Sequence, residues 1–147
     1  MKLTDIFVCK GNGSFSKENF RPVQNSSVFW VKPKGGLWSS PENAPYGWED
    51  WAKDNNFSCN LDEEFRFRLS AGAKVLEITN ARQLDDLPKL EHNNKYSWVA
   101  LDFEALARKY DAMLVMISND QQLYWDLYGW DCDTLLVFNP DVIRIID

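Results

Sequence analysis

The sequence contains one histidine and three cysteines, and this scarcity removes several classes of site. His92 stands in a polar run with no second histidine, and Cys9, Cys59 and Cys132 show no Cys-x-x-Cys spacing. A tetrahedral metal site therefore lacks ligands, and a disulfide framework lacks an even set of cysteines. A catalytic triad would need His92 as its base, and no Gly-x-Ser-x-Gly nucleophile motif is present. We predict neither a metal centre nor a triad hydrolase, and we expect reduced cysteines.

Phosphate-binding loops and long apolar runs are also missing. The chain has no Gly-x-x-x-x-Gly-Lys-Ser/Thr segment, and Gly11-Asn-Gly13 is not followed by the third glycine of a dinucleotide fingerprint. No apolar run approaches the ~20 residues that a membrane-spanning helix needs. Thr4 and Asp5 interrupt the only stretch that a signal peptide would use. We therefore expect neither a P-loop nor a Rossmann domain, and we predict a cytoplasmic protein that does not enter the membrane.

Length and charge set the broad class. With 147 residues, of which 45% are hydrophobic, the chain is long enough for one domain with its own core. We expect a loop-rich segment over residues 1–27 and an α+β core over residues 28–147. The net charge of -6 repels polyanions, so strong non-specific binding to nucleic acid is not expected.

Strands are predicted from β-rich or alternating apolar runs. Residues 27–32 form such a run, which Pro33 and Gly35-Gly36 end before a short strand over residues 37–40. Phe65, Phe67 and Leu69 alternate with polar residues, and this strand is predicted to form a hairpin with residues 74–79. An apolar run over residues 113–117 predicts a buried strand. A second predicted hairpin joins residues 135–138 to residues 142–146 around the turn at residues 139–141.

Helices are predicted over three shorter stretches. Trp48 and Trp51 lie three residues apart within residues 46–55, as on one face of a helix. Asn80 is the expected cap of a short helix or turn that ends at Pro88, and Asp102 is the expected N-cap of the longest helix, within residues 97–110. The pattern predicts an α+β protein with more strand than helix.

The most informative acids stand directly before the last strands. Asp131 and Asp133 precede the apolar run at residues 135–138, and both side chains would point to one side if this segment is extended. Two carboxyl groups so close to each other would share a proton or flank a cationic centre. An ordinary polar turn explains the same pattern.

The order of these segments resembles the ADP-ribosyltransferase superfamily over about residues 28–146. A basic residue ends the first strand, a Gly-Gly-Leu turn leads to Trp38-Ser39-Ser40, an aromatic helix follows, and an acid precedes the final strands. The resemblance implies two small packed β-sheets with short flanking helices and a cleft for NAD. It implies an enzyme that cleaves NAD at the nicotinamide ribose and transfers ADP-ribose to a protein or nucleic acid, as toxins and phage or conflict effectors do.

The resemblance also implies roles for single residues. Lys32 takes the place of the cofactor-binding Arg or His, and it would neutralise the pyrophosphate together with Lys34. Asp131 or Asp133 takes the place of the catalytic Glu. The second motif corresponds to Trp38, Ser39 and Ser40, and the residues expected to stack on the cationic nicotinamide ring are Tyr46 and Trp48.

Each of these residues also has a structural interpretation. Trp48 and Trp51 would serve as core residues, because burying an indole stabilises a fold by about 2–3 kcal/mol. Ser39-Ser40-Pro41 suits a turn, and the lysines suit a solvated surface. A second hypothesis is therefore a non-catalytic binding module of the same fold, whose aromatic cleft takes a protein or nucleotide partner. A structural subunit is a third.

Overall fold

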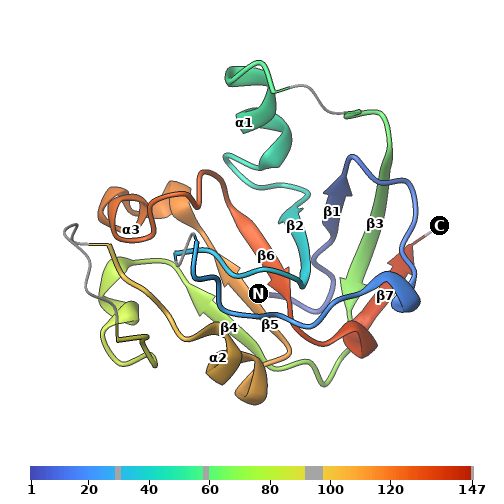
Figure 1. Ribbon diagram of the computed structural model, residues 1–147. Coiled ribbons are helices and arrows are strands. Elements are labelled where there is room, and N and C mark those ends of the chain that lie inside the picture. Colours follow the sequence, from blue (N-terminus) through green and yellow to red (C-terminus); the bar gives the residue numbers. More distant parts are fainter. Residues whose placement is uncertain (29–30, 58–59, 92–97, 147) are drawn as a thin grey trace.

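Seven strands form one mixed sheet in the computed structural model, which describes residues 1–28, 31–57, 60–91 and 98–146 (Figure 1). The strand order across the sheet is β4-β5-β6-β2-β1-β3-β7. The strands are β1 (Phe7–Lys10), β2 (Leu37–Pro41), β3 (Glu64–Leu69), β4 (Val75–Ile78), β5 (Ala112–Val115), β6 (Thr134–Val137) and β7 (Ile143–Ile146). Only the β4–β5 pair is parallel among these strands; the other neighbours run antiparallel.

Three α-helices and four 3₁₀ turns complete the described elements. The helices are α1 (Trp48–Asp54), α2 (Phe103–Lys109) and α3 (Gln121–Asp126), and the turns are η1 (Lys17–Asn19), η2 (Ala81–Leu84), η3 (Ile117–Asn119) and η4 (Pro140–Val142). The predicted α+β class with more strand than helix is confirmed. Asp102 caps α2 by accepting a hydrogen bond from the Ala105 amide at 3.1 Å, and Asn80 caps η2, both as predicted.

The neighbouring strands β5 and β6 are buried on both faces. Met113 and Leu136 point into one cluster, which includes Phe103 and Leu106 of α2 and Leu123 of α3. The alternate residues of both strands, Ala112, Leu114, Leu135 and Val137, point into a second cluster. Because successive side chains of a strand face opposite sides, a strand that is apolar throughout needs cover on both. This explains the continuous apolar runs in the sequence.

The second cluster joins the two ends of the sheet. Phe7 of β1, Phe67 of β3 and Ile143 of β7 pack in it together with Leu135 and Val137 of β6. The β1-β3-β7 end therefore shares a core with β5 and β6, while hydrogen bonds through β2 keep the sheet continuous. The two separate sheets expected from the sequence are not seen in the described strands, which form two parts of a single sheet.

Both predicted hairpins are wrong. β3 pairs with β1 and β7, whereas β4 lies at the opposite edge and pairs with β5. Likewise β6 pairs with β2 and β5, and β7 pairs with β3. Strands that are adjacent in the sequence are here separated across the sheet, because each end of the sheet is assembled from distant parts of the chain.

The N-terminal segment contributes more to the fold than its composition predicts. β1 lies between β2 and β3, with Phe7 paired to Pro41 on one side and to Phe67 on the other. The expected loop over residues 1–27 therefore contains a central strand. The strand expected at residues 27–32 is not formed by residues 27, 28, 31 and 32, which are bends or turns, and Phe29 and Trp30 lie outside the described residues.

A double-glycine turn sets the entry into β2, as the sequence predicts. Gly35 and Gly36 have φ angles of 77° and 73°, a region that residues with a side chain rarely adopt. A Cβ atom on Gly36 would lie 2.6 Å from Leu136 Cδ1, so the absence of a side chain also lets β2 approach β6. The turn thereby brings Trp38 and both following serines against β6.

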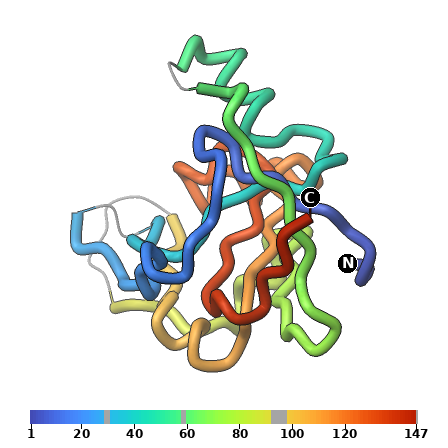
Figure 2. Tube along the Cα trace, turned by 90° about the vertical axis from the view of Figure 1, so that its right-hand side faces the viewer, coloured from blue at the N-terminus to red at the C-terminus, as the bar shows by residue number. Residues whose placement is uncertain are grey.

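Helix α1 projects from the rest of the molecule, as Figures 1 and 2 show from two directions. Ala52 is its one buried residue. The predicted helix within residues 46–55 is confirmed, and the helix α3 has no counterpart among the predicted elements.

Within the described parts of the chain, no helix has the length and apolar character that would let it cross a membrane.

Candidate functional site: a tryptophan-lined cleft

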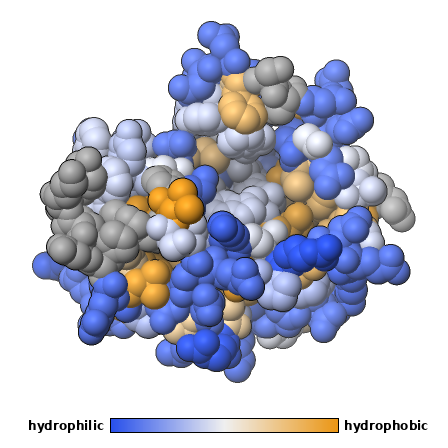
Figure 3. Space-filling view, in the orientation of Figure 1, coloured by the Kyte–Doolittle hydropathy of each residue, from blue (hydrophilic) through white to orange (hydrophobic). Residues whose placement is uncertain are grey.

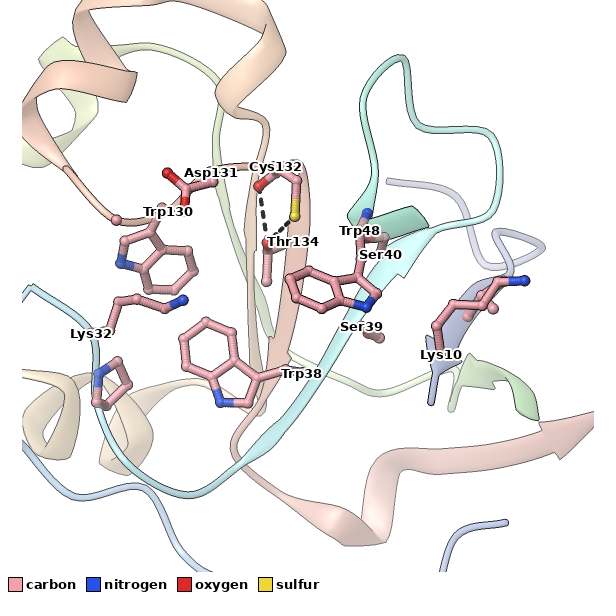
Figure 4. Close-up of a pocket in the computed structure, with 13 residues that line it drawn as sticks. Lys10, Lys32, Trp38, Ser39, Ser40, Trp48, Trp130, Asp131, Cys132 and Thr134 are labelled. Carbon is pink, nitrogen blue, oxygen red and sulfur yellow. Dashed lines mark hydrogen bonds between the residues drawn. The ribbon is translucent and has the colours of Figure 1, made fainter. Parts of the chain in front are cut away.

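A cleft of about 510 Å³ opens between β2, β6 and the projecting α1, where the space-filling view shows a hollow (Figure 3). Its walls include Trp38 from β2, Trp48 from the first turn of α1, and Trp130 from the segment before β6. The three indoles surround the space shown in Figure 4. We call this cavity the tryptophan cleft.

The indoles are held in place by contacts outside the cleft. Trp130 is 1% exposed, and its Nε1 donates a hydrogen bond to the Val31 carbonyl at 2.8 Å. Its ring lies 5.0 Å from that of Trp38, whose own Nε1 donates to the Gly35 carbonyl at 3.0 Å. Because both polar atoms are satisfied by backbone groups, the rings present apolar faces to the cavity.

Trp48 is supported from behind by two other aromatic rings. Its ring stacks on Trp51 at 5.1 Å between centroids, and the edge-on Phe57 ring lies at 5.3 Å. The sequence suggested that Trp48 and Trp51 share a helical face, and the structure confirms that they do. Trp48 and Trp51 are partly exposed and are not core residues. With Phe57 they form an aromatic group on α1, from which Trp48 reaches the cleft wall.

Two lysines lie on opposite sides of the cleft (Figure 4). Lys32 places its Nζ 4.9 Å from the centroid of the Trp38 ring, and no residue in the described part of the chain forms an ion pair with it. Lys10 at the end of β1 is bound by Glu64 at 3.1 Å and Glu49 at 3.4 Å. Burial opposes the charge of Lys10, but these two carboxylates outweigh it and raise the pKa of the amine. Lys32 is therefore the cation that remains open to a ligand.

Both predicted serines line the cleft, and both hydroxyls have protein partners. Ser39 Oγ donates to the Leu135 carbonyl at 3.0 Å. Ser40 Oγ donates to the Asp133 carbonyl at 2.8 Å and accepts from the Trp48 amide at 2.9 Å. Each serine thus ties β2 to the β6 segment, and Ser40 also anchors the start of α1.

Asp133 lies in the interior, where it connects three segments. Its side chain is fully buried and accepts hydrogen bonds from the Ser118 amide at 2.8 Å, the Ser118 hydroxyl at 2.7 Å and the Tyr46 amide at 3.2 Å. Its own amide donates to the Tyr46 carbonyl at 2.8 Å. A buried carboxylate needs donors of this kind to offset the loss of its hydration. Asp133 therefore holds the cleft walls together and does not line the cleft.

Asp131 lines the cleft and is partly exposed beside Trp130. The expectation that Asp131 and Asp133 point to the same side is wrong, because the chain bends at Cys132 instead of running fully extended. The bend sends one carboxylate to the cavity and the other to the interior. Of the two, Asp131 is the one that lines the cleft.

The remaining polar wall consists of Cys132 and Thr134. The Cys132 thiol lies 3.7 Å from the Thr134 hydroxyl, which donates to the Cys132 carbonyl at 2.9 Å. Burial raises the pKa of the Cys132 thiol, so the neutral form is favoured. Cys9 is also buried and free, and burial raises its pKa to about 11. Cys59 and His92 lie outside the described residues.

Six of the nine residues singled out in the sequence line this one cavity: Lys32, Trp38, Ser39, Ser40, Trp48 and Asp131. Three do not line it. Lys34 is exposed, Asp133 is interior, and the Tyr46 hydroxyl donates to the Asp54 carboxylate at 2.7 Å, a contact that raises the pKa of Tyr46 to about 12.

Sequence reasoning missed Lys10, Trp130 and Thr134 as wall residues. Trp130 stands next to Asp131 in the sequence, so proximity to the predicted acid was an available signal. Lys10 was missed because the segment that contains β1 was assigned to a loop. The run Phe7-Val-Cys-Lys10 does show buried residues at alternate positions, which is the pattern of a strand with one covered face.

A smaller cavity of about 250 Å³ adjoins the tryptophan cleft and shares with it Val8, Lys10, Ser40 and Trp48. Its lining includes the first residues of α1.

In the parts of the chain that the structure describes, no group of three or more His, Cys, Asp or Glu side chains is arranged to hold a metal ion.

Comparison of the chain with protein-family models, with curated proteins and with solved structures found no match.

Proposed function

We propose that the tryptophan cleft binds NAD and that the protein is an ADP-ribosyltransferase, which cleaves NAD at the nicotinamide ribose and transfers ADP-ribose to a macromolecular acceptor. The observation that carries this proposal is the convergence of Lys32, Trp38, Trp48 and Asp131 on one cavity. These side chains supply a cation, flat aromatic surfaces and a carboxylate. A ligand that carries both phosphates and a cationic ring can use the cation for its phosphates and the aromatic surfaces for its ring.

The dimensions and chemistry of the cleft suit a ligand of this class. Pockets for small molecules and cofactors usually measure roughly 300–1,000 Å³ and combine apolar walls with a few polar groups. The cleft, at about 510 Å³, lies within that range. Its walls include the indoles of Trp38 and Trp48, and indole rings attract cationic and planar rings. The nicotinamide ring of NAD has both properties.

Lys32 is the proposed partner of the pyrophosphate. It lies in the cleft wall without a protein carboxylate in the described residues, so its charge is available to a ligand. An ammonium group neutralises phosphate as a point charge and does not need the two-pronged geometry of an arginine. Lys34 is exposed and lies outside the cleft wall, so we assign the role to Lys32 alone.

Asp131 is the proposed catalytic residue. Cleavage of the bond between nicotinamide and ribose leaves positive charge on the ribose, and a fixed carboxylate beside it stabilises that charge. The nicotinamide departs with the electron pair of the broken bond. An acceptor nucleophile then forms the new bond to the same ribose carbon and loses its proton. Asp133 is not assigned to this step, because its oxygens already accept three protein hydrogen bonds.

The serines are proposed to support the cleft and not to bind the carboxamide. Ser39 and Ser40 donate their hydroxyl protons to backbone carbonyls of the β6 segment. These bonds fix β2 beside β6 and hold the walls at a constant separation.

Release of nicotinamide from NAD tests the catalytic proposal. Asp131→Asn keeps the size of the side chain and removes its charge, so we expect release to fall by about 100-fold or more. Asp86→Asn is the matched control, because Asp86 is exposed in the segment after η2 and should leave release unchanged. Equal rates for wild type and Asp131→Asn would remove Asp131 from the mechanism.

A second candidate is a non-catalytic module that binds a nucleotide in the same cleft. One observation favours it: both serine hydroxyls of the cleft wall are engaged by the protein, which leaves Asp131 as the one lining side chain assigned to catalysis. Tryptophan fluorescence during titration with NAD separates the candidates. Saturable quenching without nicotinamide release supports the module, and quenching with release supports the enzyme.

A further inference from the structure

A group of aromatic side chains lies on the surface of α3 and the turn that follows it. Trp125 is 52% exposed and Tyr128 is 40% exposed. The Tyr128 ring stacks on Trp98 with centroids 4.9 Å apart and planes 10° apart, and Tyr124 meets Trp125 edge-on at 5.2 Å. We call these four residues the α3 aromatic surface. Exposed Trp and Tyr side chains in contact with one another are typical of protein interfaces.

The sequence segment that contains α3 carries acidic residues and no basic ones. Residues 110–143 contain six aspartates and no Lys, Arg, Glu or His, so this stretch alone accounts for a charge equal to the net charge of the chain, -6. Two of these acids, Asp126 and Asp131, flank Tyr128 in the sequence and are partly exposed. Among the described residues neither forms an ion pair. The field at this surface therefore attracts cations.

The α3 aromatic surface continues to the tryptophan cleft. Gly129, Trp130 and Asp131 directly follow Tyr128, and all three line the cleft. Burial raises the pKa of Tyr124, and the nearby charge of Asp131 raises it further, as expected if that carboxylate lies within electrostatic reach of the aromatic surface. A partner bound at α3 would therefore extend to the rim of the cleft.

We propose that the α3 aromatic surface docks an arginine- or lysine-rich segment of a partner protein. A guanidinium or ammonium group is attracted to the face of an exposed indole or phenol ring, and the neighbouring carboxylates strengthen that attraction. A nucleic acid would offer stacking bases, but its phosphates would meet the partly exposed carboxylates of Asp126 and Asp131, which no cation pairs with among the described residues. Charge complementarity therefore selects a basic polypeptide.

This docking goes beyond the NAD chemistry proposed above, because it uses exposed rings outside the cleft and requires no NAD. A binding assay without NAD tests it separately. The probe is a short fluorescent peptide that alternates arginine with glycine, and its anisotropy is followed during titration with the full chain. The matched probe alternates glutamate with glycine, and a labelled oligouridylate of similar size tests the nucleic-acid alternative.

Trp125→Leu is the main variant, because leucine keeps an apolar side chain in a helix and removes the aromatic ring. We expect it to weaken binding of the arginine peptide by about fivefold, the effect of losing one exposed cation–π contact. Asp126→Asn should weaken binding by about threefold through loss of one charge. Ile145→Thr on β7 is the control, since Ile145 is 48% exposed on an edge strand distant from α3 in the sheet order. It should bind as wild type does.

The proposal is overturned by any of three results. The arginine peptide binds equally well to wild type and to Trp125→Leu, the glutamate peptide binds as tightly as the arginine peptide, or the oligouridylate binds more tightly than either. Circular dichroism of each variant shows whether the protein remains folded, and Asp126→Asn provides a second measurement that leaves the aromatic rings unchanged.

Discussion

Asp131 and Asp133 lie two residues apart, yet one belongs to an open cleft and the other to a closed hydrogen-bond network. Asp133 is fully buried and accepts three hydrogen bonds from Ser118 and Tyr46. Asp131 is partly exposed at the rim of a cavity. A carboxylate whose acceptor positions are filled by the protein holds structure together, whereas one left open is available to a ligand.

The two lysines of the cleft differ in the same way, since one is paired by the protein and the other is not. Both serines belong with the paired groups. Lys10 is held by Glu49 and Glu64, whereas Lys32 faces the cleft beside an indole ring. Ser40 is bonded on both sides, to Asp133 and to Trp48. The paired groups form a frame, some members of which also line the cleft, whereas Lys32 and Asp131 line the cleft without an ion-pair partner among the described residues. Substitutions in the frame should therefore cost much more stability than substitutions of the open lining groups.

The largest effect is expected from Asp133→Ala. The substitution leaves the Ser118 amide, the Ser118 hydroxyl and the Tyr46 amide without their acceptor, so the free energy of unfolding should fall by about 4 kcal/mol. Asp131→Ala should change it by less than about 0.5 kcal/mol. Urea denaturation at neutral pH measures both. Similar losses for the two variants would end the distinction between frame and lining.

Ser40→Ala should have the next largest effect. Its hydroxyl bridges the Asp133 carbonyl and the Trp48 amide, so we expect a loss of about 2 kcal/mol, compared with about 1 kcal/mol for Ser39→Ala, which removes one bond. Hydrogen exchange adds a local readout. The Trp48 amide should exchange faster in Ser40→Ala and remain unchanged in Ser39→Ala, and the reverse order would contradict the assigned anchor.

A third prediction concerns Asp102, a paired acid distant from the cleft. The Asn25 amide and the Ala105 backbone hold the pKa of Asp102 below its usual value. Because the native pKa is lowered, this contribution is complete above pH about 4 and is lost as the pH falls through the lowered pKa. Asp102→Ala should cost about 1 kcal/mol at neutral pH, and Asp102→Asn less, since Asn also caps helices.

Thermal denaturation of wild type and Asp102→Ala between neutral and acidic pH provides the check. The gap between the two proteins should be widest at neutral pH and should close in acid. A gap that stays constant over this range would show that the carboxylate charge is not what stabilises the start of α2.

The smallest effect on stability is expected from Lys32→Met and its neighbour control Lys34→Met. Both should lie within about 0.5 kcal/mol of wild type, because neither lysine forms an ion pair in the described residues. Their ligand affinities should differ. Lys32→Met should weaken NAD binding by about tenfold, the effect of one charge-assisted contact, and Lys34→Met should not. Isothermal titration calorimetry measures this, and equal affinities would remove Lys32 from the site.

Local patterns allowed much of the fold to be predicted from the sequence. The alternation at Phe65, Phe67 and Leu69 predicted β3, and the polar residues Asn80 and Asp102 predicted two caps. The pairing of strands was not predictable in the same way. Each strand of four to six residues is compatible with many partners, and adjacency in the sequence favoured two hairpins that do not form.

The candidate site was predictable in part for the same reason. Lys32, Trp38, Ser39 and Ser40 are close in the sequence, so a single short segment brought most of them together. Lys10 was missed because its strand was taken for a loop. Asp131 and Asp133 would face the same side of an extended segment, because they lie two residues apart. The bend at Cys132 turns them to different sides.

The sequence by itself determined which residue types this protein brings to a site: indoles, lysines and acids without a histidine pair, a phosphate loop or clustered cysteines. It also determined the approximate positions of most helices and strands, because capping and alternation are local effects. The tertiary structure alone decided that Asp131 faces the cleft while Asp133 is buried, and that Lys32 remains unpaired while Lys10 is not. The role of a polar group depends on which partners surround it, and those partners come from distant parts of the chain.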